Sequence, residues 1–166
     1  MEAARLATPD DVARLAELYR LAGEEMIPTR GGAILLLREA RRDPVEASLA
    51  AEVADPDRGV WVGTIDCFVV GYVTGRIEDL SPDVRLGVIE DLFVEPEARA
   101  VGVGEALANA ILAWFESRGC TGADAMALPG ARATKNFFEE TGFTARLLVM
   151  HHAFAPLPAT GTDGDG

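Results

Sequence analysis

The chain has 166 residues, of which 49% are hydrophobic, and a formal net charge of −12 at pH 7. This length supports one hydrophobic core, and we expect a single domain over residues 1–154. The negative charge argues against binding to nucleic acid or anionic membranes, and no apolar run approaches the ~20 residues that span a bilayer. Because the first residues lack the basic start and apolar stretch of a secretory signal, we expect a cytoplasmic protein.

The two cysteines, Cys67 and Cys120, lie far apart, with no CxxC motif and no histidine cluster nearby. This pattern predicts neither a metal site nor a disulfide framework. We expect two small buried thiols, because free cysteine is among the most buried residue types. No metal is therefore expected as a cofactor.

Two helix start signals precede the predicted strands. The first, over residues 8–11, combines an N-cap threonine, a proline at the first helical position and an acid at the third. The second, over residues 43–46, opens a short helix that continues to about Val53. Between them, Gly31-Gly32 interrupts the chain, and we expect the apolar run over 34–37 to wall a substrate cleft or form a dimer contact.

Strand and helix signals alternate in the rest of the chain. From Val60 the residues are β-branched and aromatic, which predicts strands over 60–65 and 67–74 with a tight turn near Asp66, then a third strand over 84–94. Consecutive hairpins of this kind imply antiparallel pairing. The later predicted elements are helices over 104–117 and 132–141, a strand over 120–128 and a last strand over 143–154.

The order of these elements defines the expected fold class. A helix that connects two strands of one sheet requires a parallel pair, so the strands over 88–94 and 120–128 should run parallel. We therefore expect an α/β fold with a mixed, mostly antiparallel central sheet, one parallel strand pair and flanking helices. Residues 155–166, rich in Gly, Pro, Thr and Asp, are expected to form a disordered C-terminal tail.

A glycine-containing turn follows the predicted strand over 88–94. The pattern Arg99-x-x-Gly102-x-Gly104 stands where a helix begins. The leading amides of a helix have no intrahelical acceptor and lie at the positive end of its dipole, so a pyrophosphate fits there without a lysine. The three-glycine dinucleotide fingerprint and the Lys-Ser or Lys-Thr pair of a P-loop are both absent.

Two blocks of the sequence resemble the GCN5-related N-acetyltransferase (GNAT) family. The pattern from Arg99 to Gly104 is similar to the acyl-CoA signature of that family, and residues 133–143 are similar to its later helix, which ends in Gly-Phe. The resemblance covers about residues 60–154. It implies a GNAT-like fold with a splayed parallel strand pair, and direct transfer of an acetyl group from acetyl-CoA to a primary amine of a small molecule or peptide. A homodimer is also implied, and the apolar residues 147–150 of the last strand would suit one.

Glu90 and Asp91 are the candidates for proton transfer, because both interrupt an apolar strand. Strand alternation places them on opposite faces, and burial would raise the pKa of either carboxyl toward the range in which it accepts a proton from an ammonium group. In the resembled family an acid at the Glu90 position often serves as general base, and the amide of Val94 stabilises the oxyanion. Alternatively, each acid pairs with Arg76, Arg85 or solvent.

Phe138 departs from the family pattern, because many relatives carry a tyrosine there that protonates the departing thiolate. A thiol with a pKa near ~8.5 is a tolerable leaving group, so water could supply that proton. The departure leaves two alternatives open: a non-catalytic acyl-CoA sensor, or a partner-binding module of the same fold.

The resemblance places CoA contacts at the strand end, the glycine turn and the later helix. The side chain of Arg99 lies over the pyrophosphate, or faces solvent while the amides of its loop make the contacts. Lys135 meets a CoA phosphate or pantetheine edge, or is part of a solvated helix face. The expected CoA-binding residues are Leu92, Phe93, Val94, Arg99, Ala100, Val101, Gly102, Val103, Gly104, Glu105, Thr134, Lys135 and Phe138.

Overall fold

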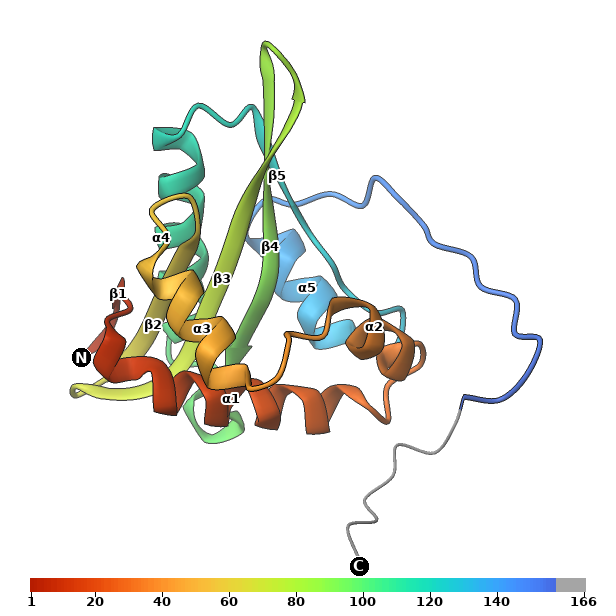
Figure 1. Ribbon diagram of the computed structural model, residues 1–166, viewed down its shortest axis with the longest axis horizontal. Helices are drawn as coiled ribbons and strands as arrows, with labels where there is room; N and C mark the ends of the chain where they lie inside the picture. Colours follow the sequence, from red (N-terminus) through yellow and green to blue (C-terminus); the bar gives the residue numbers. More distant parts are fainter. Residues whose placement is uncertain (158–166) are drawn as a thin grey trace, which may run out of the picture.

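One five-stranded sheet with helices on both faces organises the chain (Figure 1). The computed structural model describes residues 1–157; residues 158–166, most of the predicted tail, lie outside the described residues. The strands are ordered β1-β2-β3-β4-β5, and all neighbours are antiparallel except the parallel pair β4–β5. This confirms the predicted sheet. The strands are β1 (Glu2–Leu6), β2 (Gly59–Ile65), β3 (Phe68–Ser81), β4 (Val84–Val94) and β5 (Gly122–Ala125).

Helices cover the two faces of the sheet with separate apolar clusters. On one face, α1 and α3 contribute Leu15 and Leu49, which pack with Val62 of β2. On the other, α4 contributes Leu107, which packs with Val73 of β3. Within residues 1–157, no helix is long and apolar enough to cross a membrane. The helices are α1 (Val12–Met26), α2 (Gly32–Glu39), α3 (Val45–Ala54), α4 (Val103–Ser117) and α5 (Arg132–Glu140), with short 3-10 turns at Pro9–Asp11 and Pro96–Ala98.

The predicted helix start over residues 8–11 is confirmed, and one of its residues, Asp11, also pairs with a residue of strand β1. The backbone N–H of Thr8 donates to the Asp11 carboxylate at 2.8 Å, and Arg5 of β1 donates to both Asp11 oxygens at 2.8 Å. Arg5 lowers the pKa of Asp11 to about 2, against the opposing effect of burial. The start of α3 at Val45 is confirmed too. Strand β1, which supplies Arg5, and helix α2 were not predicted.

The predicted strand over 143–154 is wrong. No strand pairing involves these residues, and the side chains of Leu147 to Met150 are 72–82% exposed. Strand preference reflects packing on a half-buried pleated surface, and the side chains of Leu147 to Met150 find no such surface among residues 1–157. Strand β5 is also shorter than predicted. The thiol prediction fails as well, because Cys67 is exposed in the turn before β3 and Cys120 is only half-buried.

An irregularity in β4 prepares the functional site. Opposite β3, Thr74 pairs with Asp91 and the next residue, Gly75, pairs with Ile89, so Glu90 is the extra residue of a β-bulge. Pairing between β4 and β5 covers Leu86 to Ile89 and ends there. Residues 90–94 of β4 therefore have no strand beside them on the β5 side, and the sheet opens at this point.

Candidate active site

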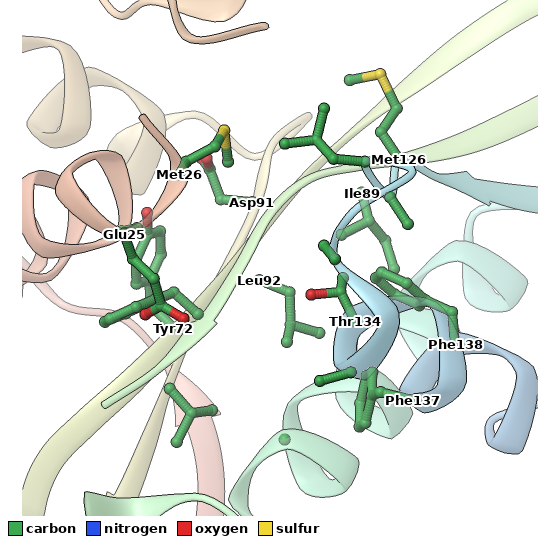
Figure 2. Close-up of a pocket in the computed structure, with 18 of the residues that line it drawn as sticks. Glu25, Met26, Tyr72, Ile89, Asp91, Leu92, Met126, Thr134, Phe137 and Phe138 are labelled. Carbon is green, nitrogen blue, oxygen red and sulfur yellow. The ribbon is translucent and has the colours of Figure 1, made fainter. Parts of the chain in front are cut away.

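A cavity of about 1070 Å³ lies where the sheet opens. Its volume matches the upper end of the range for small-ligand sites, so it has room for two substrates. Figure 2 shows Met26, Asp91 and Tyr72 on one side of Leu92, and Thr134 and Phe138 on the other. The cavity thus extends from the face covered by α1 to the face covered by α4 and α5.

The start of α4 offers unpaired backbone donors to this cavity. Gly102 precedes the helix with φ 95°, and no side chain caps it. Within residues 1–157, no acceptor is bonded to the backbone N–H groups of Gly102, Val103, Gly104 or Glu105. Gly102, Gly104 and Glu105 also line the cavity. Together these groups form a site for an anion.

The open edge of β4 supplies a second row of backbone groups. The Glu95 N–H donates to the Val70 carbonyl of β3 at 2.9 Å. In an antiparallel pair the residues that face the neighbouring strand alternate, so the N–H groups of Leu92 and Val94 face away from β3 and toward the gap. The amide of Val94 therefore faces the gap, and its contact with an oxyanion stays a prediction.

Arg99 joins the glycine turn to α1. Its Nε donates to the Val94 carbonyl at 2.8 Å, and its guanidinium donates to both carboxylate oxygens of Glu25 at 2.9 and 2.6 Å. It also lies over the Phe93 ring, 5.6 Å from the centroid. Because these contacts engage most of its donors, Arg99 holds the turn in place, and the prediction that the backbone amides are the chief anion contacts is the one that fits its position.

Glu90 and Asp91 face the same side of the sheet, so the prediction of opposite faces is wrong. Thr74 donates to Asp91 at 2.9 Å and Arg76 donates to Glu90 at 3.3 Å, and these two β3 residues share a face because they are two positions apart. The bulge at Glu90 breaks the alternation on which the prediction depended.

An ion-pair chain connects the two acids through α3. Asp91 pairs with Arg41 at 2.6 Å, and Arg41 donates to both oxygens of Glu52 at 2.8 and 3.1 Å. Arg58 lies 3.4 Å from Glu52 and pairs closely with Glu90. Burial disfavours the charged form of Arg41, but Asp91 and Glu52 outweigh it and raise its pKa.

The pKa of Glu90 is raised. Burial is the main cause, and the positive charges of Arg58 and Arg76 oppose it. A carboxyl with a raised pKa is better matched to accepting a proton near neutral pH than an exposed one. Glu90 lines the cavity, and its ion pair with Arg76 also matches the alternative that the sequence left open, so its role as general base stays a prediction.

Most predicted CoA-binding residues line the cavity, but three do not. Val103 is buried in the core, Val101 is exposed away from the cavity, and Lys135 pairs with Glu139 at 2.6 Å on the surface of α5. Of the two alternatives for Lys135, its position therefore matches the second, a residue on a solvated helix face. Those that line the cavity are Leu92, Phe93, Val94, Arg99, Ala100, Gly102, Gly104, Glu105, Thr134 and Phe138.

Sequence reasoning identified only part of the wall opposite α5. The expectation that the apolar run over 34–37 walls a cleft is met, because Leu35 and Leu36 line the cavity. Tyr19 and Tyr72, which lie outside both motifs, also line it. Their helical and strand patterns indicated only burial, and the sequence holds no signal that their side chains line a cavity.

The acetyltransferase (GNAT) family model matches residues 15–143, and the chain belongs to this family. The site agrees with that assignment, since an open sheet edge and unpaired helix amides meet at one cavity. No curated protein sequence matches the chain.

Solved structures share the fold at low sequence identity. An AAC(6')-Iy complex with the bisubstrate analogue CoA-S-monomethyl-acetylneamine is 16% identical with a TM-score of 0.71, covering 94% of this chain and 99% of that one. An aminoglycoside acetyltransferase from an uncultured soil metagenomic sample, in complex with sisomicin, is 18% identical with a TM-score of 0.68, covering 94% and 97%. A ribosomal-protein-alanine N-acetyltransferase from Brucella melitensis biovar Abortus 2308 is 15% identical with a TM-score of 0.67, covering 93% and 100%.

Proposed function

We propose that this protein transfers an acetyl group directly from acetyl-CoA to a primary amine of a small molecule or peptide. The observation that carries the proposal is the row of unpaired N–H groups at the start of α4, beside a cavity that extends to both faces of the sheet. One substrate can enter from each face, and holding both together removes much of the entropic barrier to their reaction.

The donor would bind along the α4 and α5 side. The diphosphate of CoA would accept hydrogen bonds from the amides of Gly102 to Glu105, and its pantetheine arm would follow the open edge of β4. Thr134 and Phe138 of α5 line the same side. The thioester carbonyl would accept from the Val94 N–H, which stabilises the oxyanion of the transition state.

The acceptor would bind on the α1 and α2 side. Four carboxylates line the cavity there: Glu25, Glu39, Glu90 and Asp91. Each of the four has an arginine partner, so the general attraction for a cationic amine comes from the net charge of −12, and the carboxylate oxygens serve as hydrogen-bond acceptors. Structural neighbours described as aminoglycoside and ribosomal-protein-alanine acetyltransferases support an amine acceptor of either size.

Glu90 would remove a proton from the bound ammonium, directly or through water. The amine nitrogen then forms a bond to the thioester carbon, the carbon–sulfur bond breaks, and the nitrogen releases its second proton to water. The thiolate takes a proton from water because Phe138 has none to give. No covalent intermediate on the protein is needed. Asp91, whose carboxylate pairs with Arg41, would assist by binding the acceptor.

A CoA-binding sensor without catalysis is the second candidate, and Phe138 favours it because the position lacks an acidic hydroxyl. Release of free thiol from acetyl-CoA, measured across polyamines, aminoglycosides, amino acids and peptides, distinguishes the two. Thiol release supports the enzyme; CoA binding by calorimetry without turnover supports the sensor. Absence of both refutes the CoA site and favours a partner-binding module.

We also propose a cytoplasmic homodimer. Leu147 to Met150 expose four apolar side chains in a row, and burial against a second copy would remove them from water. The exposed thiol of Cys67 is suited to a reducing compartment.

A further inference from the structure

Tyr72 carries a buried hydroxyl group with no partner. The residue is fully buried in β3, lines the cavity, and its Oη forms no hydrogen bond with any of residues 1–157. A buried hydroxyl without a partner is costly, so its presence in a substrate cavity calls for a ligand atom.

Asp91 offers a second unused acceptor on the same face of the sheet. Arg41 and Thr74 both contact Oδ2, and no described residue donates to Oδ1. Tyr72 lies opposite Phe93, which makes it the diagonal cross-strand neighbour of Asp91 on the same face. Figure 2 shows both on the side of the cavity formed by Glu25 and Met26.

The electrostatics agree with this proximity. Burial raises the pKa of Tyr72 well above its ordinary value, and the charge of Asp91 raises it further. The phenol therefore stays protonated and uncharged, with its oxygen lone pairs available to an N–H donor.

We propose that Tyr72 Oη and Asp91 Oδ1 hold two N–H groups of the reacting nitrogen and thereby select primary amines over secondary amines. A primary ammonium ion has three N–H groups. Two would bind these acceptors, and the third proton would pass to Glu90, which leaves a lone pair free to attack the thioester. A secondary ammonium ion has two N–H groups, so once one proton is lost it can satisfy one acceptor but not both.

This inference rests on the proposed acetyl transfer, and Tyr72→Phe tests it with the whole chain. The probes are butylamine and N-methylbutylamine, assayed by thiol release from acetyl-CoA. We expect the variant to raise KM for butylamine roughly tenfold, which is the effect of one lost hydrogen bond, with little change for N-methylbutylamine. The ratio of the two kcat/KM values would then fall roughly tenfold. An unchanged ratio would overturn the inference.

Thermal unfolding gives an independent readout, with Tyr19→Phe as the matched variant. The Tyr19 hydroxyl accepts from the Arg41 N–H at 3.1 Å, so its loss leaves a donor unpaired and should lower Tm. Tyr72→Phe removes a hydroxyl without a partner and should leave Tm unchanged or raise it. A fall in Tm equal to that of Tyr19→Phe would mean that the Tyr72 hydroxyl serves the fold, and would overturn the inference.

Calorimetry separates failure of this inference from failure of the proposed function. Butylamine is titrated into the CoA-saturated protein and into its Tyr72→Phe variant. Roughly tenfold weaker binding to the variant, without thiol release by either protein, would refute acetyl transfer and retain the amine site. Equal affinity for both proteins would refute the amine site alone.

Discussion

The α4 amide site can be tested with two glycines that share a backbone conformation but not a location. Gly102 precedes α4 with φ 95°, and Gly119 follows it with φ 77°; a Cβ at either position would meet no atom within 4 Å. Alanine therefore adds backbone strain at both positions without a steric clash. The expected cost is about 1–2 kcal/mol in each case, which corresponds to a fall in Tm of roughly 2–8 °C.

The two variants should differ in CoA binding. Gly102 lines the cavity and sets the direction of the amides that follow it, whereas Gly119 lies at the far end of the helix. Relief of strain at Gly102→Ala would turn one or more amides from the diphosphate, and a hydrogen bond to a charged group contributes about 1.5–3 kcal/mol. Calorimetry should therefore show CoA affinity reduced about tenfold or more in Gly102→Ala and unchanged in Gly119→Ala. Equal affinities would refute the amide site.

Three further predictions concern catalysis, stability and assembly. Glu90→Gln should lower kcat/KM by about 100-fold or more and abolish the acidic limb of the pH–rate profile. In the unaltered protein this limb should lie above the ordinary carboxyl range, because burial raises the pKa of Glu90. If the variant keeps the limb, another group is the base. Because the pKa of Asp11 is lowered from 3.8 to about 2, its carboxylate should stabilise the fold by about 2 kcal/mol at pH 7. Urea titrations should show that this contribution to the free energy of unfolding disappears as pH falls from 3.8 to about 2. The Asp11→Asn variant should show no such pH-dependent loss. Leu148→Asp should convert a dimer to a monomer in sedimentation experiments; a monomeric unaltered protein would refute the homodimer.

Local signals in the sequence sufficed for most of the fold. Helix start residues, hairpin alternation and left-handed glycines act over a few neighbouring positions, and β4 and the end of α4 at Ser117 were predicted at the residues observed. The failures involve partners distant in sequence. Strand β1 is polar and short, and it is identified only by its pairing with β2, some 60 residues later. The segment over 143–154 has the composition of a strand but pairs with no strand among residues 1–157.

In the candidate site too, features set by neighbouring residues were predictable and features set by distant partners were not. The glycine turn was predictable because its chemistry lies in consecutive amides, and the departure at Phe138 was visible as a single position. The shared face of Glu90 and Asp91 was not, since it depends on a one-residue bulge that only the register with Thr74 and Gly75 reveals. That bulge has a chemical consequence. With strict alternation the two acids would lie on opposite faces, whereas the observed register places both carboxylates on one face. The proposed mechanism needs this arrangement, since it assigns proton removal to one acid and binding of the nitrogen to the other.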